Sequence, residues 1–260
     1  MKVVILSGGT GTRLREVTEF IPKALVPIGG RPMIWHIMKI YAYYGFRDFV
    51  LALGYKQEAF KEYFRHFNEI NNDVLIRTGY CEGIHITTPQ GEFPDDWIVR
   101  LSDTGINAMK GARLKKIQKY IVDDTFMCTY GDAVSDINIT NLLAFHHSHG
   151  KIATITGVHP KARFGEVHHD NGYVQSFTEK PNDDKCLMNG GFMVFHKDIF
   201  DLLSEVDTCD LELGVLDKLA QNQQLMVYHH KGFWACMDNY KEMTELQFAW
   251  DTDKPPWKVW

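Results

Sequence analysis

The sequence predicts an α/β fold in which a mostly parallel sheet is flanked by helices, and three observations support this class. Short apolar runs typical of strands alternate with segments whose apolar residues recur at helical spacing. The first apolar run ends in a glycine-rich loop, as at a strand-to-helix junction. A later run, Thr125–Tyr130, reads as a buried strand and ends at Gly131-Asp132. Because strands that alternate with helices usually pair in parallel, we expect a Rossmann-like sheet, mostly parallel or mixed.

The elements before residue 150 follow one another in a regular order. Lys2–Leu6 is predicted as the first strand, and apolar residues at helical spacing run from Pro32 to Gly45. The further expected elements are a strand at Asp48–Leu53, a helix at Gln57–Phe67, a strand at Asp73–Arg77, a helix over Leu114–Ile121, the Thr125–Tyr130 strand and a helix at Ile139–His147. Residues 80–96 lack periodicity, so we expect a long loop that serves as a lid, as an oligomer contact or as a plain surface excursion.

After Gly150 strand patterns predominate. The expected strands are Lys151–Val158, Gly172–Phe177, Gly191–Phe195 and Leu225–Tyr228, with one helix near Leu211–Gln221. We expect this half to complete the sheet and to add a layer that faces the sugar. The whole chain, residues 1–260, is therefore predicted to be a single domain with two halves, 1–150 and 151–260.

Composition limits the classes of partner and compartment. The 260 residues are 45% hydrophobic and 23% charged, as in ordinary globular proteins. A net charge of −5 with interspersed signs gives no electrostatic case for nucleic acid or for an anionic membrane. The five cysteines show no paired or zinc-binding spacing, and no run approaches the ~20 apolar residues of a membrane span. We expect a cytoplasmic protein with reduced thiols.

The glycine-rich loop carries the strongest chemical signal. It spans Leu6–Leu14 and is followed by Pro22-Lys23. Closely spaced glycines let backbone N–H groups converge on an anion, and Arg13 and Lys23 add positive charge, so the loop indicates a triphosphate. It is neither a Walker A loop nor a dinucleotide fingerprint, because Leu14 stands at the third glycine position, which also disfavours a dehydrogenase. Taken alone, such a loop could be only a tight turn.

Two aspartates are candidate metal ligands. Asp132 directly follows a predicted buried strand, which places it at the sheet edge where ligands bind in open α/β folds. Asp238 is its candidate partner, since Mg²⁺ needs only one or two carboxylates besides substrate phosphates and water. Asp136 is expected to cap the following helix. Of the histidine clusters, His146-His147-x-His149 falls at a predicted helix C-terminus, where such side chains suit the helix dipole, and zinc or iron binding is not favoured.

Motifs along nearly the whole chain resemble the sugar-1-phosphate nucleotidylyltransferases and, within them, the glucose-1-phosphate cytidylyltransferases. Four elements are general to the wider family: Gly8-Gly9-x-Gly11-Thr12-Arg13-Leu14, Pro22-Lys23, Gly131-Asp132 and Glu179-Lys180-Pro181. Three point to the cytidylyl branch: Trp35-His36-Ile37-Met38, Asp103-Thr104-Gly105 and Pro256-Trp257-Lys258. The resemblance implies the nucleotide-diphospho-sugar transferase type of α/β fold. Five positions depart from the usual pattern: Ser7, Ala24, Lys110, Ala112 and Ala133.

The resemblance also implies roles for individual residues. The nucleotide would contact Leu6, Ser7, Gly8, Gly9, Thr10, Gly11, Thr12, Thr104, Arg113 and Gly131. The catalytic residues would be Arg13, on the leaving pyrophosphate, and Lys23, on the α-phosphate. Asp132 and Asp238 would hold Mg²⁺. The sugar phosphate would contact Glu179, Lys180, Asn189 and Gly190.

The activity implied is Mg²⁺-dependent transfer of CMP from CTP to α-D-glucose 1-phosphate, giving CDP-glucose and pyrophosphate by in-line attack on the α-phosphorus. The product would enter polysaccharide biosynthesis, and the enzyme would be a homo-oligomer. Two alternatives stay open: a related nucleotidylyltransferase with a different nucleotide or sugar phosphate, and a catalytically silent regulator that binds nucleotide sugars. Arg13, Lys23, Asp132 and Asp238 together speak against the second, since a pure binder could lose a metal carboxylate.

Overall fold

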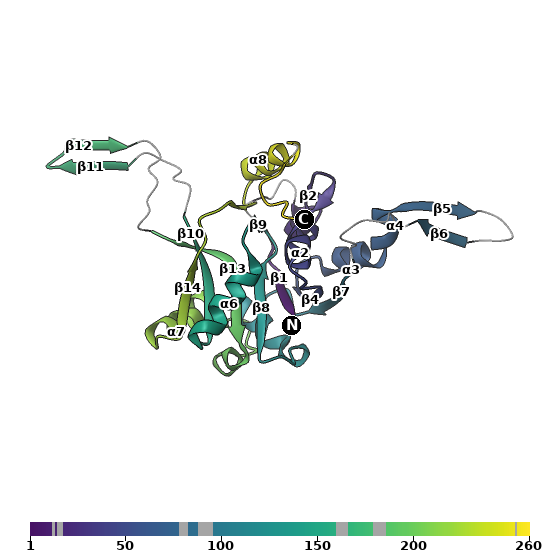
Figure 1. Ribbon diagram of the computed structural model, residues 1–260, viewed down its shortest axis with the longest axis horizontal. Helices are drawn as coiled ribbons and strands as arrows, with labels where there is room; N and C mark the ends of the chain where they lie inside the picture. Colours follow the sequence, from purple (N-terminus) through teal and green to yellow (C-terminus); the bar gives the residue numbers. More distant parts are fainter. Residues whose placement is uncertain are drawn as a thin grey trace.

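The computed structural model describes residues 1–11, 14, 18–77, 83–87, 96–159, 166–178, 186–252 and 254–260. Its centre is a seven-stranded sheet with helices on both faces, as predicted (Figure 1). In spatial order the strands are β14 (Leu225–His229), β10 (Ala153–Val158), β13 (Met188–His196), β8 (Thr125–Tyr130), β1 (Val3–Ser7), β4 (Asp48–Leu53) and β7 (Ile98–Asp103). β13 runs antiparallel to both neighbours and the other pairs are parallel, so the sheet is mixed.

The central strands are largely apolar because both of their faces are covered. In β1, Val3 and Ile5 pack into one core, while Val4 and Leu6 pack into a second core on the opposite face. Both cores receive side chains from helices, so a continuous apolar run, rather than alternation, is what a buried parallel strand requires.

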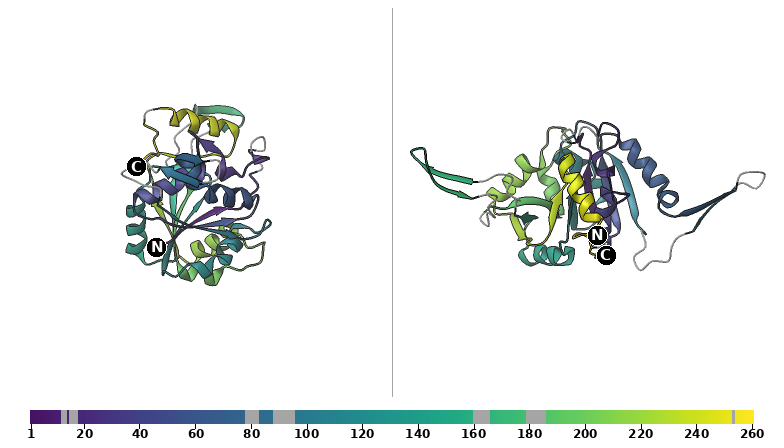
Figure 2. Two further views of the ribbon diagram at one scale, coloured as in Figure 1. Left: turned by 90° about the vertical axis from the view of Figure 1, so that its right-hand side faces the viewer. Right: turned by 90° about the horizontal axis from the view of Figure 1, so that it is seen from above.

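The helices divide between the two cores. The first core is covered by α2 (Met33–Tyr43), α3 (Gln57–Arg65), α6 (Ile139–His149) and α8 (Tyr240–Trp250). The second is covered by α5 (Lys110–Lys116), η4 (Lys197–Leu202), η5 (Leu211–Leu216) and α7 (Asp217–Gln221). In the left view of Figure 2, α8 lies on one side of the strands and the helices of residues 197–221 lie on the other. Within the described residues, no helix is long and apolar enough to cross a membrane.

Two helices correct details of the prediction. Asn138, not Asp136, caps α6, because its side chain accepts a hydrogen bond from the Asn141 N–H at 2.9 Å. Asp136 instead pairs with His230, with 3.0 Å between Oδ1 and Nε2. The helix predicted over 114–121 begins earlier, at Lys110, and gives way after Lys116 to a short 3₁₀ turn, η3 (Gln118–Tyr120).

The C-terminal tail packs within the chain. Trp257 is 1% exposed and stacks on Phe233, with the ring of Trp250 beside it. Its indole N–H points to Nδ1 of His36, 3.4 Å away on α2. His36 is buried, and Ile28 O lies 2.9 Å from its Nε2. Burial lowers the pKa of His36 to about 4, so the ring is neutral near pH 7.

Among the residues that the structure describes, four two-stranded ribbons stand apart from the main sheet. They pair β2 (Pro27–Ile28) with β3 (Arg31–Pro32), β5 (Asp73–Arg77) with β6 (Gly83–Thr87), β9 (Ala133–Ser135) with β15 (Trp234–Cys236), and β11 (Glu166–Asp170) with β12 (Tyr173–Thr178). The β5–β6 and β11–β12 ribbons project from opposite ends of the body (Figure 1). The expectation that strands after residue 150 complete the sheet is therefore wrong for β12. Of the 80–96 segment, β6 is a strand, and most of the remainder lies outside the described residues.

Candidate active site

A cavity of about 370 Å³ opens where the carboxyl ends of β1 and β8 meet α5. It is lined by Leu6, Ser7, Gly8, Gly9, Gly11, Lys23, Ala24, Ala108, Met109, Lys110, Arg113, Tyr130, Gly131, Asp132, Asp210 and Asp238. β1 and β8 are parallel neighbours with Leu6 opposite Tyr130, so the loop after each strand emerges at the same edge. The Gly131 N–H donates to Leu6 O at 3.2 Å, which ties the two loops together. The cavity therefore lies at the edge that the sequence predicts.

Asp132 and Asp238 are brought together by the small β9–β15 ribbon. β9 begins one residue after Asp132, and Ala133 lies opposite Cys236 at the end of β15. The Met237 N–H then donates to Asp132 O at 2.9 Å, so both aspartates leave the ribbon at the same end.

Lys23 lies between the two carboxylates. Its Nζ is 2.6 Å from Asp132 Oδ2 and 2.6 Å from Asp238 Oδ1. Burial by itself would lower the pKa of Lys23, but the charges and hydrogen bonds of both aspartates outweigh it and raise the pKa above its usual value. The lysine is thus charged at neutral pH, and one cation already bridges the two carboxylates.

The aspartates present a fitting donor set for Mg²⁺. Both carboxylates reach the same positively charged atom, so one divalent ion could contact both, and carboxylate oxygens are the ligands that Mg²⁺ prefers. The neighbouring Cys236 thiol is a poor ligand, because burial and the nearby carboxylate of Glu242 raise its pKa to about 12. The histidines do not join this centre in the part of the chain described; His146 and His149 both lie against the Thr154 hydroxyl, at 2.9 and 2.8 Å.

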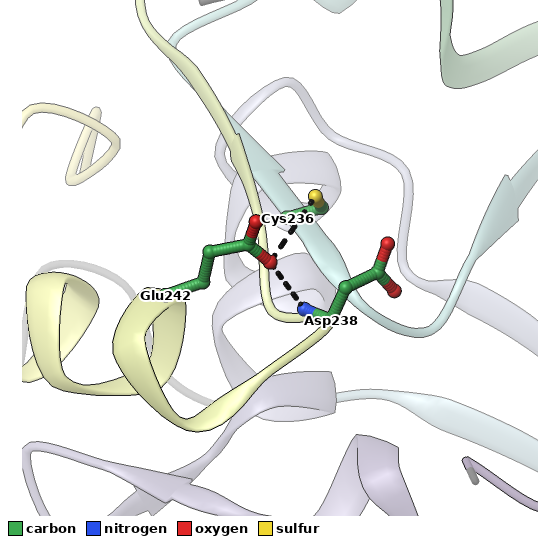
Figure 3. Close-up of side chains that lie close together, drawn as sticks. All are labelled: Cys236, Asp238 and Glu242. Carbon is green, nitrogen blue, oxygen red and sulfur yellow. Dashed lines mark hydrogen bonds between the residues drawn. The ribbon is translucent and has the colours of Figure 1, made fainter. Parts of the chain in front are cut away.

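Glu242 holds Asp238 in place, a contact that the sequence analysis missed. Its Oε2 accepts a hydrogen bond from the Asp238 N–H at 2.7 Å and lies 3.9 Å from Cys236 Sγ (Figure 3). The Asp238 carboxylate points away from Glu242. In return, Asn239 caps α8 by accepting from the Glu242 N–H at 3.0 Å. The spacing Asn239-x-x-Glu242 is typical of a helix start and is the signal that could have identified α8.

Arg113 is buried and fixed on backbone oxygens at the other end of the cavity. Its Nη1 donates to Leu53 O, Gly105 O and Thr104 Oγ1 at 2.8–3.0 Å, and its Nη2 donates to Gly8 O at 3.0 Å. A Cβ on Gly8 would lie 2.1 Å from Nη1, so glycine is required there to admit the guanidinium. Arg113 therefore fixes the shape of the glycine-rich loop and of the turn at Thr104.

A second group of polar side chains surrounds Tyr130, a lining residue at the end of β8. The Tyr130 hydroxyl donates to Glu212 Oε1 at 2.5 Å and accepts from Asn189 Nδ2 at 3.3 Å. Lys110 pairs with Glu212, and its Nζ lies 4.7 Å from the centre of the Tyr130 ring. Glu212 and the role of Tyr130 were not expected from the sequence, because they depend on η5 packing against α5.

The predicted site residues fall into three groups. Those that line the cavity are Leu6, Ser7, Gly8, Gly9, Gly11, Lys23, Arg113, Gly131, Asp132 and Asp238. Four lie beyond its lining, namely Thr10, Thr104, Asn189 and Gly190. Of these, Thr104 and Asn189 touch lining residues through Arg113 and Tyr130. Thr12, Arg13, Glu179 and Lys180 lie outside the described residues.

The chain matches a known protein family and full-length relatives. The nucleotidyl transferase family matches residues 2–250. A glucose-1-phosphate cytidylyltransferase of Salmonella typhi is 42% identical over 265 residues, and the match covers 100% of both chains. A probable glucose-1-phosphate cytidylyltransferase of Bacillus subtilis (strain 168) is 40% identical over 260 residues, again with 100% of both covered. A UTP–glucose-1-phosphate uridylyltransferase of Synechocystis is 30% identical over 85% of this chain and 56% of the relative.

Solved structures share the fold at low sequence identity. A UDP-glucose pyrophosphorylase complexed with UDP-glucose superposes with a TM-score of 0.69 at 14% identity, covering 97% of this chain and 99% of that one. A putative glucose-1-phosphate thymidylyltransferase from Bacillus anthracis gives 0.66 at 18% identity, covering 95% and 94%. These likenesses show that the α/β architecture is the one found in nucleotidyltransferases.

Proposed function

The chain belongs to the nucleotidyl transferase family, and from this premise we propose that it transfers CMP from CTP to α-D-glucose 1-phosphate, giving CDP-glucose and pyrophosphate. The observation that carries the chemistry is the cation-binding pair Asp132 and Asp238, which meets around Lys23 in a cavity bordered by the glycine-rich loop. The choice of CTP and glucose 1-phosphate is supported by identities of 40–42% along the full length of relatives that bear this name.

The reaction needs positioning and positive charge more than it needs a base. A sugar phosphate is already anionic near neutral pH, so one of its oxygens can attack the α-phosphorus directly. A new P–O bond forms, the bond between the α-phosphorus and the oxygen of the β-phosphate breaks, and pyrophosphate leaves with that electron pair. Negative charge grows at the α-phosphate and on the leaving group, and the residues of the site act by stabilising it.

Lys23 and the two aspartates divide this task. Asp132 and Asp238 would hold Mg²⁺, which when bound supplies positive charge to the triphosphate. With Asp132 and Asp238 engaged in holding the metal, the Lys23 ammonium would be released from their carboxylates and would face the α-phosphate. Arg13, which lies outside the described residues, would stabilise the pyrophosphate. Without Lys23 the growing charge loses a stabiliser worth ~100-fold or more in rate.

The remaining residues would bind the two substrates. The loop from Leu6 to Gly11, held in shape by Arg113, would enclose the nucleotide. Asn189, whose side-chain amide donates to the Tyr130 hydroxyl, would contact the sugar phosphate together with Gly190. Glu179 and Lys180, which lie outside the described residues, would contact it as well. Both substrates are metabolites of the cytoplasm, and we place the enzyme there, with its product entering polysaccharide synthesis.

We further propose that the protein is a homo-oligomer, with the β11–β12 ribbon in the interface. A two-stranded ribbon is only marginally stable by itself. This one exposes the large side chains of Val167, Tyr173, Val174 and Phe177, the last at 62%. Apolar side chains on a projecting ribbon favour contact with another copy of the chain. Light scattering on the purified protein tests this, and a monomer at micromolar concentration contradicts it.

The nucleotide and reaction are tested together by pyrophosphate release. The purified chain is incubated with Mg²⁺ and glucose 1-phosphate and with CTP, UTP, dTTP, GTP or ATP in separate assays. The proposal requires release with CTP at a kcat/KM well above that for the others. Release with another nucleotide in preference to CTP would make the protein a related nucleotidylyltransferase, and CTP binding without release from any nucleotide would make it a silent regulator.

A further inference from the structure

Ser7, one of the residues that line the cavity, carries a hydroxyl without a hydrogen-bond partner among the described residues. It is the last residue of β1, it is 9% exposed, and it lines the cavity. Its Oγ is buried and has no hydrogen-bond partner among the residues that the structure describes. A buried hydroxyl without a partner carries a desolvation penalty, so a partner supplied by a ligand would be favourable.

The Ser7 hydroxyl lies between two ends of the cavity, one at Lys23 and Asp132 and the other at Arg113. On one side, a Cβ built on Gly131 would lie 2.5 Å from Ser7 Oγ and 3.1 Å from the Cβ of Ala24. Gly131 and Ala24 are the chain neighbours of Asp132 and Lys23, so this side is the transfer end. On the other side, Gly8 follows Ser7 and carries the contact with Arg113. Ser7 therefore precedes the residue that contacts Arg113, and its side chain lies beside the residues next to Asp132 and Lys23.

A nucleotide that spans these two ends must pass its sugar over Ser7. In CTP the ribose connects the base to the triphosphate. The proposed function places the α-phosphate at Lys23, and Arg113 is among the expected nucleotide contacts; with the base at the Arg113 end of the cavity, the ribose is the part that lies between them. A ribose hydroxyl can both donate and accept, as a serine hydroxyl can, so the two groups are matched partners.

We propose that the Ser7 hydroxyl hydrogen bonds to a ribose hydroxyl of the bound nucleotide and makes this chain select nucleotides that carry this hydroxyl over analogues that lack it. A deoxynucleotide would leave Ser7 Oγ buried and unpaired, and a site built to bond a hydroxyl discriminates against the analogue that lacks it. This inference rests on the proposed function for the orientation of the nucleotide. It adds a residue that determines specificity at the sugar of the nucleotide.

The test combines one substitution with three nucleotides. Wild-type protein and Ser7→Ala are compared with CTP, 2′-deoxy-CTP and 3′-deoxy-CTP, measuring kcat/KM for pyrophosphate release and, independently of turnover, Kd by calorimetry. We expect Ser7→Ala to weaken CTP about 5–10-fold, the scale of one neutral hydrogen bond. The nucleotide that lacks the bonded hydroxyl should be unaffected, so its disadvantage against CTP shrinks by the same factor.

A matched control separates binding from folding. Ser135 is also buried, but its hydroxyl donates to Phe233 O at 2.7 Å. Ser135→Ala should therefore lower the melting temperature and leave the preference for CTP over deoxy-CTP unchanged. Ser7→Ala should not lower the melting temperature of the unliganded protein, since no hydrogen bond within the described chain is lost.

Two results overturn the inference. Equal losses with all three nucleotides would mean that the hydroxyl faces a phosphate, and unchanged binding of all three would mean that it does not contact the nucleotide. If wild-type protein binds CTP but releases no pyrophosphate, the proposed function fails, while the ratio of the Kd values still decides the role of Ser7.

Discussion

Replacing Lys23 with methionine removes its contacts with two carboxylates while keeping a side chain of similar length. In the structure, Nζ lies 2.6 Å from an oxygen of each aspartate, and the three side chains are 15–31% exposed. One pair of unit charges 4 Å apart is worth about 4 kcal/mol at an effective dielectric constant of 20. Because the ammonium also loses hydration on burial, we expect a net loss of about 2 kcal/mol in the free energy of unfolding, or roughly 5 °C in melting temperature.

The same substitution should strengthen metal binding and slow turnover. Without the ammonium, the negative charges of Asp132 and Asp238 are not compensated. Mg²⁺ no longer has to compete with the lysine for the two carboxylates, so the affinity of the protein for Mg²⁺ should rise roughly tenfold. Turnover should nevertheless fall by ~100-fold or more, because the charge on the α-phosphate loses its stabiliser. Calorimetric titration of the nucleotide-free protein with Mg²⁺ gives the first quantity, and pyrophosphate release gives the second.

The control is Lys2→Met, which removes a lysine paired with Asp48. It should leave both metal affinity and turnover unchanged. If Lys23→Met binds Mg²⁺ no more tightly than the wild-type protein, the ammonium does not occupy the place of the metal. Near-normal turnover of Lys23→Met would refute its role in transfer.

Three further predictions concern the supports of the site. Glu242→Ala should weaken Mg²⁺ binding about 10-fold, because it releases the backbone of Asp238. The control Asn239→Ala removes only the helix cap, so it should lower the melting temperature by a few degrees and leave Mg²⁺ affinity near normal. Arg113→Lys cannot reproduce the fork on Gly8 O and its neighbours, so KM for CTP should rise at least 10-fold; an unchanged KM would mean that the loop keeps its shape without the guanidinium. His36 has a pKa of about 4 when folded against 6.5 when unfolded, so the unfolded state binds more protons between these values. Stability is therefore full above pH 6.5 and falls by on the order of 3 kcal/mol as the pH drops toward 4, a slope that His36→Gln should flatten in denaturant titrations.

The fold was largely predictable because its strands are buried on both faces. The strands Val3 to Ser7 and Thr125 to Tyr130 are mostly apolar because the two cores lie on either side of the sheet. That pattern identifies central parallel strands without knowledge of their partners. The strand at Tyr173–Thr178 was also identified, but its place was not. Strand preference does not specify a partner, so a projecting ribbon and a sheet edge look alike in sequence.

The candidate site was predictable only where a single local sequence pattern indicated it. A glycine-rich loop after a strand and an aspartate after a strand both depend on neighbours in the sequence. The meeting of Asp132, Asp238 and Lys23 depends instead on the pairing of β9 with β15, which no local pattern encodes. Glu242 acts through a backbone N–H, and Glu212 through the packing of η5 on α5, so neither could be assigned from residue type and spacing.

The most direct test of the central claim is ³¹P NMR of one reaction mixture containing the purified chain, CTP, glucose 1-phosphate and Mg²⁺, with Asp132→Asn as the parallel sample. We expect equal amounts of pyrophosphate and CDP-glucose with the wild-type chain, and loss of both by ~100-fold or more with Asp132→Asn. Unchanged CTP and glucose 1-phosphate after incubation with the wild-type chain, or equal product from the two proteins, would contradict it.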